Sequence, residues 1–209
     1  MNRLLMRVAA AAPALLVACT TPTVNVTQYD LGLPPASAAL DQRAANARTL
    51  AEVSAPAWLD NPSIAYRLAY DDANQVHGYA QSRWVAAPAS LLVQRLRERL
   101  PITLLPVIAR ADTTLATDYL LQVELDEFSQ VFDTPQASRA LLRARATLID
   151  LRRHELIAQR VFEVQRPAAP PNALGAVLGL RDAVDEFITE LLRWTDQESI
   201  RAGAPLPQG

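Results

Sequence analysis

The strongest restriction on the architecture comes from three consecutive runs of alternating apolar and polar residues in the second half of the chain. They occupy residues 118–133, 137–151 and 155–166. Side chains of a strand point alternately to the two faces of a sheet, so this alternation predicts three long strands. The connections between the runs are short and polar, which is typical of an antiparallel meander. One face of such a meander is apolar and needs a covering layer.

The middle run shows the two faces most clearly. Its apolar residues are Leu142, Ala144, Ala146 and Leu148, and the residues between them are Arg143, Arg145 and Thr147. The apolar set is predicted to pack on a helix, and the other set to face water. Glu124 and Asp126 in the preceding run are placed to oppose the arginines, and each such cross-strand pair contributes about 0.2–1 kcal/mol.

Two segments have the spacing of amphipathic helices, and the first is residues 88–100. It begins with Pro88, at a position where proline suits a first helical residue, and leucines recur every four residues from Leu92. We place Arg95 on the polar side of this helix, together with the charged residues that follow it.

The second helix is predicted at residues 173–197, where apolar residues recur with helical spacing as far as Trp194. Gly175 and Gly179 are expected to weaken its first turns, so its stable part should begin near Leu180.

The first half of the chain supplies shorter strands, expected at residues 23–32, 49–53, 62–70 and 76–85, with a polar turn at 71–75. Together the elements predict an α+β fold, a mixed and mostly antiparallel sheet with two main helices, 88–100 and 180–195, packed on one face. We expect a single domain over residues 19–200 and a disordered tail at 201–209. The strand order stays open, because the first-half strands could join either edge of the meander.

The composition agrees with one globular domain and excludes a class of partners. The chain has 209 residues, half of them hydrophobic, which is enough to bury a core. Its net charge is −2 and its pI is about 5.7. This charge lacks the basic excess of a nucleic-acid-binding protein, so we expect no nucleic-acid partner.

Residues 1–18 have the plan of a lipoprotein signal peptide. Arg3 and Arg7 give a positive start, and the apolar run from Val8 to Val17 is too short to span a bilayer as a helix. The run ends in Leu16-Val17-Ala18-Cys19, which resembles the bacterial lipobox.

The resemblance to a lipobox gives Cys19, the only cysteine of the chain, a specific role. In such signals the thiol receives a diacylglycerol, the leader is cut before the cysteine, and the new amino group is acylated. Several acyl chains on one residue anchor a protein stably. Thr20 follows in place of the aspartate that retains lipoproteins in the inner membrane, which favours the periplasmic face of the outer membrane. The alternative is an ordinary signal followed by a buried structural cysteine.

A family resemblance rests on residues 56–100, PAWLDNPSIAYRLAYDDANQVHGYAQSRWVAAPASLLVQRLRERL. The matching positions are Pro56, Leu59, Ile64, Tyr66, Arg67, Tyr79, Arg83, Trp84, Pro88 and Leu92. Their plan is a loop with Pro and Leu, a Tyr-Arg strand, a return strand ending in Arg-Trp, and a leucine-rich helix. This plan resembles the ABC-type transport auxiliary lipoproteins, a group that includes the PqiC-type lipoproteins.

The resemblance implies an accessory role in systems where MCE-domain proteins carry lipids or hydrophobic solutes across the bacterial envelope. The lipoprotein would meet a periplasmic MCE partner and hydrolyse nothing itself. Because MCE proteins form rings, a matching homo-oligomeric ring of the lipoprotein is a further expectation. Two other functions stay open, an envelope lipoprotein hydrolase and a structural or assembly lipoprotein with no transport role.

Six residues are candidates for contact with the partner. They are Trp58, Tyr66, Arg67, Tyr79, Arg83 and Trp84. Exposed aromatic and arginine side chains are frequent anchors of protein interfaces. The structural alternative is that the aromatic rings belong to the core and the arginines cap it or form salt bridges, because large rings usually serve the core.

The sequence does not point to a catalytic or metal centre. The segment RRHEL lacks the second histidine of a zinc-binding H-E-x-x-H, and His77 and His154 are expected in separate turns. Neither a nucleophile elbow nor a glycine-rich phosphate loop is present. We therefore expect no metal and no cofactor other than the lipid on Cys19.

Overall fold

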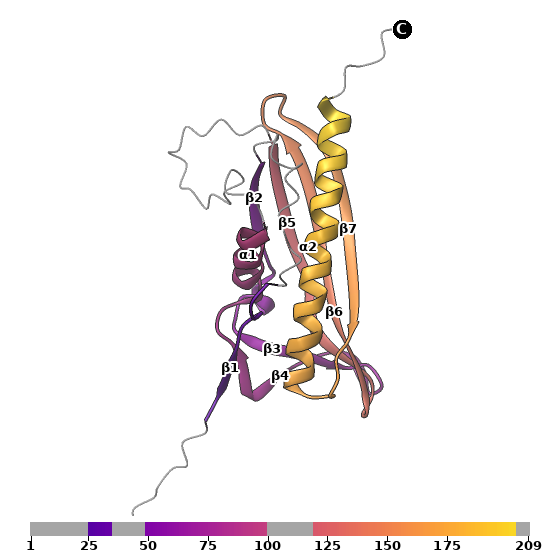
Figure 1. The fold of residues 1–209 in the computed structure, drawn as a ribbon. Coiled ribbons are helices and arrows are strands. Elements are labelled where there is room, and N and C mark those ends of the chain that lie inside the picture. Colours follow the sequence, from indigo (N-terminus) through magenta and orange to yellow (C-terminus); the bar gives the residue numbers. More distant parts are fainter. Residues whose placement is uncertain (1–24, 35–48, 100–118, 204–209) are drawn as a thin grey trace, which may run out of the picture.

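The structure, a computed structural model, describes residues 25–34, 49–99 and 119–203. Cys19 and its leader therefore lie outside the described residues, as does the segment that follows the first helix. The predicted α+β class is confirmed: a seven-stranded mixed sheet carries two helices (Figure 1).

The meander predicted from the alternation is present, with bounds that differ by at most one residue. It consists of β5 (Tyr119–Thr134), β6 (Ala137–Asp150) and β7 (Glu155–Pro167), paired antiparallel in that order. The four apolar residues expected on the covered face of β6 are all completely buried. The alternating pattern predicts burial correctly here because β6 has a neighbouring strand on both sides. Whether a β6 side chain is buried therefore depends only on the face of the sheet to which it points.

The first-half strands join the free edge of β5, and their order could not be predicted. β2 (Thr49–Ser54) pairs in parallel with the beginning of β5, and β3 (Ser63–Leu68) pairs in parallel with its last third. A short 3₁₀ helix, η2 (Ala57–Leu59), lies between β2 and β3. The resulting order is β1-β4-β3-β5-β6-β7, with β2 beside β3 along the same edge of β5.

The hairpin of β3 and β4 (Asp72–Trp84) turns earlier than expected. The predicted polar turn at 71–75 is wrong by about three residues, because β4 already begins at Asp72 and the turn occupies residues 69–71. The Nη1 group of Arg67 donates a hydrogen bond to the carbonyl of Ala73 at 3.2 Å, which holds the early return. β1 (Thr27–Tyr29) covers only part of the expected 23–32, of which residues 23 and 24 lie outside the described ones, and it pairs in parallel with the end of β4.

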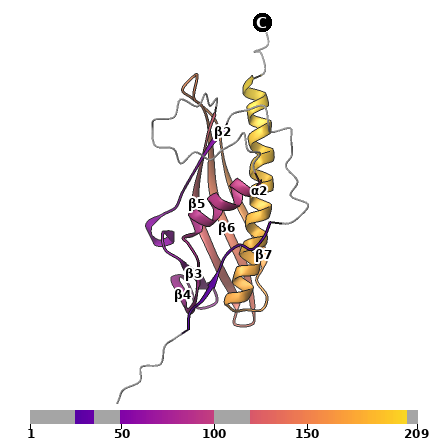
Figure 2. The same ribbon diagram turned by 60° about the vertical axis from the view of Figure 1, so that its left-hand side comes forward.

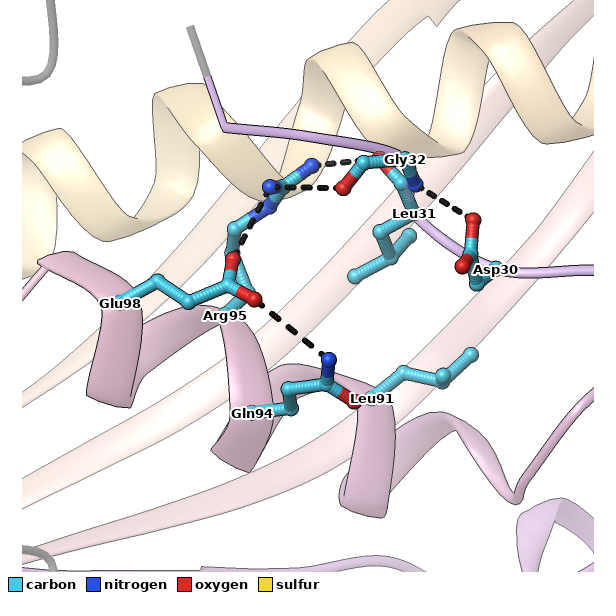
Figure 3. A pocket seen from close by; sticks show the side chains of 7 residues that line it. All are labelled: Asp30, Leu31, Gly32, Leu91, Gln94, Arg95 and Glu98. Atoms are coloured by element: carbon cyan, nitrogen blue, oxygen red, sulfur yellow. Dashed lines mark hydrogen bonds and ion pairs between the residues drawn. The ribbon is translucent and has the colours of Figure 1, made fainter.

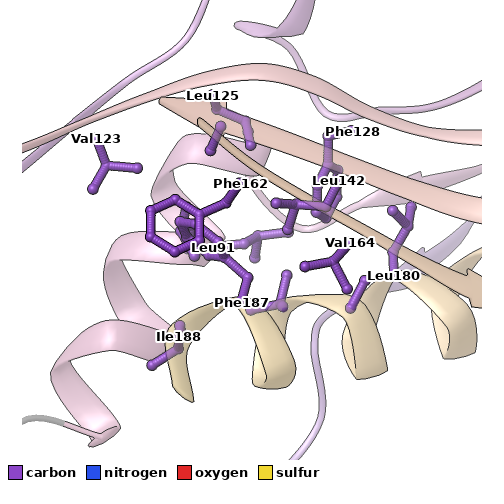
Figure 4. Close-up of a cluster of buried hydrophobic side chains, with 14 of the residues drawn as sticks. Leu91, Val123, Leu125, Phe128, Leu142, Phe162, Val164, Leu180, Phe187 and Ile188 are labelled. Atoms are coloured by element: carbon purple, nitrogen blue, oxygen red, sulfur yellow. The ribbon is translucent and has the colours of Figure 1, made fainter. Parts of the chain in front are cut away.

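Both helices lie on the same face of the sheet, as Figure 2 shows. α1 (Pro88–Arg99) lies against β2 at about the middle of the sheet's length, and α2 (Ala173–Gly203) runs along the meander. Between helices and sheet lies one core, of which Figure 4 shows a part. There Phe162 of β7 packs edge-on against Phe187 and Trp194 of α2, with ring centroids 5.5 and 5.8 Å apart.

The start of α2 corrects the expectation that its stable part begins near Leu180. The helix begins at Ala173, where the side chain of Asn172 accepts a hydrogen bond from the backbone N–H of Gly175 at 3.1 Å. Gly179 is buried against the sheet, and a Cβ there would lie 2.9 Å from the Cβ of Ala140 and 2.8 Å from the carbonyl oxygen of Pro167. The glycine therefore allows a close approach of helix and strand. The helix continues to Gly203, into the segment expected to be a tail.

A β-bulge in β5 changes which residues face the core. Leu125 pairs with Ala144 and Glu127 pairs with Arg143, so Asp126 is an extra residue on β5. Leu125 and Phe128 are both buried in the core although they are three residues apart. Of the two acidic residues expected opposite the arginines, Glu124 pairs with Arg145, with an ion pair of 3.4 Å, and Asp126 does not.

Candidate contact surface on the β3–β4 hairpin

The two faces of the hairpin divide the six candidate residues into different environments. Ile64 of β3 is completely buried in the core, so Ile64 and Tyr66 mark the face that carries the helices. Ser63, Ala65 and Arg67 point to the opposite face, which we call the outer face. Paired residues of an antiparallel ladder share a face, so Gly78 (opposite Ala65) and Arg83 (opposite Ser63) belong to it as well.

An irregularity in β4 brings Arg83 to this position. Two steps along β3, from Ala65 to Ser63, correspond to five steps along β4, from Gly78 to Arg83. The extra residues change the side to which the following side chains point. Trp84 thereby turns into the core and Arg83 turns outward.

On the face that carries the helices, Tyr66 is the centre of an aromatic cluster. Its ring centroid lies 5.1 Å from that of His77, 4.8 Å from Tyr79 and 5.9 Å from Phe132. His77 thus lies in β4, and the expectation that it lies in a turn is wrong. Half-buried rings at these distances favour the structural alternative for Tyr66 and Tyr79.

The hydroxyl of Tyr79 continues this cluster into a partly buried chain of polar groups. It donates to the Oε1 of Gln130 at 2.6 Å, and the Nε2 of Gln130 donates to the hydroxyl of Ser138 at 2.7 Å. Ser138 in turn donates to the carbonyl of Ala168, in the loop before α2, at 2.8 Å. Burial, together with the neighbouring hydroxyl of Tyr66, raises the pKa of Tyr79 to about 12. The chain ties three strands to the loop that starts α2.

On the outer face, Arg67 holds the indole of Trp58 in place. The guanidinium lies 5.4 Å from the centroid of the Trp58 ring and donates two hydrogen bonds to the carboxylate of Glu127, at 2.8 and 3.3 Å. Trp58, the middle residue of η2, remains 37% exposed. The cation is therefore used to orient an exposed aromatic ring.

A hollow of about 210 Å³ lies beside this ring, between η2 and the hairpin. Its lining includes Trp58, Leu59, Ser63, Ala65, Val76 and Gly78. The pair Ala65–Gly78 contributes two of the smallest side chains at directly opposed positions, which leaves the space open. We call this feature the Trp58 hollow.

The last two candidates have opposite environments. Arg83 is exposed and, within the described part of the chain, has no ion pair or side-chain hydrogen bond. Trp84 is 1% exposed and packs against Phe128 with ring centroids 5.8 Å apart. Burial favours the core alternative for Trp84. The outer face thus brings together Trp58, Arg67 and Arg83.

Arg95 is a structurally central residue that was wrongly placed on the polar side of α1. It is 1% exposed and donates hydrogen bonds to the carbonyl groups of Leu31 and Gly32, as Figure 3 shows. Glu98 lies 3.1 Å from its Nη1 and Asp185 of α2 lies 3.2 Å from its Nε. The spacing contained the signal, because Arg95 follows Leu91 by four residues and therefore lies on the apolar stripe.

The electrostatics of this group reflect its burial. Desolvation raises the pKa of Asp185 above its ordinary value, against the opposing effect of Arg95 and Arg99. Gly32 adopts φ of +64°, and its N–H donates to the side chain of Asp30 at 2.8 Å. The turn Asp30–Gly32 thereby presents its carbonyl groups to Arg95, around a cavity of only about 20 Å³. We call this arrangement the Arg95 clasp.

No group of three or more His, Cys, Asp or Glu side chains within residues 25–34, 49–99 and 119–203 is arranged to hold a metal ion. In the same ranges, no helix combines the length and the apolar character needed to cross a membrane.

Comparison with solved structures supports the fold. The crystal structure of protein XCC0632 from Xanthomonas campestris is 20% identical, covers 74% of this chain and 85% of its own, and superposes with a TM-score of 0.63. A crystal structure of an uncharacterized protein is 13% identical, covers 81% of this chain and 98% of its own, and has a TM-score of 0.58. At these identities the likeness concerns the fold alone.

Comparison with protein families shows to which family the chain belongs. No curated protein matches the chain. The family model of the ABC-type transport auxiliary lipoprotein component matches residues 29–191, from the end of β1 into the middle of α2. The match covers most of the chain and includes the Arg95 clasp and the hairpin. The chain therefore belongs to the family of ABC-type transport auxiliary lipoprotein components.

Proposed function

We propose that this auxiliary lipoprotein is anchored in the outer membrane through Cys19 and docks a periplasmic MCE-domain protein, without catalysing a reaction itself. The system would move lipids or hydrophobic solutes across the envelope. The observation that carries the proposal is the family match over residues 29–191, which assigns the chain to ABC-type transport as an auxiliary component.

The leader supports the anchoring part of the proposal. Cys19 follows a charged start and an apolar run, and the residue after it is Thr20. A diacylglycerol and an N-acyl chain on one residue contribute about 0.8 kcal/mol for each buried methylene group, which makes release from the membrane rare.

The outer face of the hairpin supports the docking part. It carries an exposed tryptophan held by Arg67, a hollow beside it, and an exposed arginine free of ion pairs among the described residues. Tryptophan and arginine are the residues that most often carry the binding energy of protein interfaces.

Site-directed photo-crosslinking in the native envelope tests the docking surface. A photoreactive residue at Val76, which is 45% exposed beside the hollow, should capture an MCE-domain protein. The matched control is Leu156, an apolar residue of β7 that is 63% exposed and lies far along the sheet order. The proposed partner is wrong if Val76 captures only proteins unrelated to ABC transport, and the proposed surface is wrong if Leu156 captures the same proteins as Val76.

The anchor is tested separately, by intact mass analysis of the protein purified from membranes. We expect a chain that begins at residue 19 with a diacylglycerol and an acyl group, and we expect Cys19→Ser to leave the protein unlipidated and unattached. An unmodified thiol in the native protein would contradict the anchoring proposal.

Assembly into a homo-oligomeric ring is a further part of the proposal. Among the described strands, β7 is the last of the sheet and has no partner along its outer edge, which leaves its backbone groups available to another copy. Native mass spectrometry of the lipidated protein should show a closed oligomer, and a monomer at all concentrations would exclude it.

A further inference from the structure

We propose that the outer face of the hairpin binds an extended segment of the partner as an added strand along β4, with one bulky apolar side chain in the Trp58 hollow and a carboxylate on Arg83. This inference deepens the proposed docking function and rests on it for the identity of the partner. It adds the chemistry by which the partner is recognised.

The first support is the free edge of β4. One edge of β4 pairs with β3, but on the other edge only Ser82–Trp84 pair with another described strand, β1. Residues 72–81 thus have no strand partner on that side within the described part of the chain. Backbone groups along such an edge accept an extended peptide, as in other cases of strand addition. β1 already pairs there in parallel, so the edge is accessible to a strand.

The second support is the shape of the hollow. Its floor is the opposed pair Ala65–Gly78, and Trp58 and Val76 contribute to its walls. A Cβ on residue 78 would lie 2.3 Å from the hydroxyl oxygen of Ser63, so glycine leaves room for the present position of that side chain at the floor. A volume of about 210 Å³ suits one large side chain.

The third support is that the wall of the hollow is fixed before binding. Arg67 lies against the Trp58 ring and is itself held by two hydrogen bonds to Glu127, whose side chain is only 15% exposed. An interface whose anchor is already ordered loses less conformational entropy on binding.

The fourth support is charge. Arg67 is neutralised by Glu127, whereas Arg83 is exposed and has no ion pair within the described residues. Arg83 lies opposite Ser63, which lines the hollow, so its charge is close to the hollow. A guanidinium binds a carboxylate with two parallel hydrogen bonds. The partner segment should therefore carry an acidic group close to its apolar side chain.

These features favour a peptide over an anionic lipid, which could also combine apolar and acidic groups. Only a peptide has the N–H and C=O groups that pair with the edge of β4. The hollow also ends at the Ala65–Gly78 floor and offers room for a side chain, not for an extended acyl chain.

The test selects binders for the mature lipidated protein in detergent from a library of short random linear peptides. We expect enriched peptides with one aromatic or large aliphatic residue and an Asp or Glu within a few positions. For a synthetic peptide from this set, Trp58→Ala should weaken binding by about tenfold or more. Arg83→Glu should weaken it similarly, and a peptide with arginine in place of its acidic residue should regain affinity for that variant.

The matched control is Arg97→Glu, because Arg97 of α1 is also exposed and unpaired among the described residues but is remote from the hairpin. It should leave affinity unchanged. Hydrogen exchange with the peptide bound should show new protection in residues 72–81. Two peptide variants, one N-methylated at the odd-numbered backbone nitrogens and the other at the even-numbered ones, should differ: only the variant whose methyl groups face β4 should lose binding.

Any one of three results would overturn the inference. The library yields no enriched motif, the wild type and both hairpin variants bind the peptide with equal affinity, or the bound peptide protects backbone amides outside β4 from hydrogen exchange. Binding of anionic phosphatidylglycerol vesicles that depends on Trp58 and Arg83, with no peptide selected, would identify a lipid site instead. If Val76 still captures an MCE-domain protein in the envelope while these peptide experiments fail, strand addition is wrong and the proposed docking function stands.

Discussion

The guanidinium of Arg95 and the carboxylate of Asp185 form an ion pair that joins the two helices, with Nε and Oδ1 3.2 Å apart. Arg99 adds a second contact to the same carboxylate at 3.8 Å. A buried charge without a partner is costly, so each of the two main residues depends on the other. The pair also lies where the segment after β1 meets α1 and α2.

Replacing Arg95 should therefore destabilise the protein strongly. We expect Arg95→Met to lower the free energy of unfolding by about 3 kcal/mol, at the lower end for a broken buried pair because Asp185 remains partly exposed. Chemical denaturation followed by circular dichroism measures the change. The double variant with Asp185→Leu should recover part of the loss, and Arg97→Met should change little. Equal stability of Arg95→Met and wild type would show that the clasp contributes nothing.

The raised pKa of Tyr79 predicts a dependence on alkaline pH. The folded protein holds this proton up to about pH 12, whereas an unfolded tyrosine loses it near pH 10. The corresponding stability is fully present below pH 10 and is lost as the pH rises through about 12. Unfolding free energies at pH 9 to 12 should fall more steeply for wild type than for Tyr79→Phe. Parallel curves would contradict the prediction.

The same substitution should have a cost at neutral pH. Tyr79→Phe leaves the Oε1 of the completely buried Gln130 without its donor, which should cost about 1–3 kcal/mol. The matched control is Tyr70→Phe, because Tyr70 is 48% exposed in the hairpin turn.

Asp150 predicts the opposite dependence, at acid pH. Its pKa is lowered chiefly by the backbone N–H of Arg153, then by that of Arg152, at 3.0 and 2.8 Å. The stability from this charge is present above the ordinary pKa of aspartate, near 3.8, and is lost as the pH falls through the lower folded value. Asp150→Asn should be less stable than wild type at pH 6, and the difference should shrink as the pH falls below 4. A constant difference would show that the charge is not responsible.

Gly179 tests the contact between α2 and the sheet. In an exposed helix Gly→Ala stabilises by about 1 kcal/mol. Here the added methyl group would meet Ala140 and the carbonyl of Pro167 at under 3 Å, and overpacking costs about 1–3 kcal/mol. We expect Gly179→Ala to lower the melting temperature. Gly179→Ala combined with Ala140→Gly should recover part of the loss, and a stabilised single variant would refute the close contact.

The sequence was most informative where one local rule decides the outcome. The long strands β5 to β7 follow from alternation, and residues such as Leu142 and Ala144 were placed on the correct face. The strand order was not predictable, because the parallel pairing of β3 with β5 joins segments about sixty residues apart and leaves no local pattern. The extra residue Asp126 interrupts an alternation that otherwise continues on both sides.

The contact surface was only partly predictable for a similar reason. The motif identified the hairpin, but the faces of Trp84 and Arg83 depend on the irregularity in β4, which a strict period of two does not contain. Arg95 was misplaced because its charge was given more weight than its spacing. Its burial became evident only with the carbonyl groups of Leu31 and Gly32, which come from a distant part of the chain.

The Arg95 clasp also determines how tension would enter the molecule. A pull on the N-terminal segment reaches the three paired residues of β1 first and then the carbonyl groups that Arg95 holds. Because the same guanidinium contacts α2 through Asp185, load that passes beyond β1 is shared with that helix. Force applied at the N-terminal side would therefore be divided between the edge of the sheet and the helix layer.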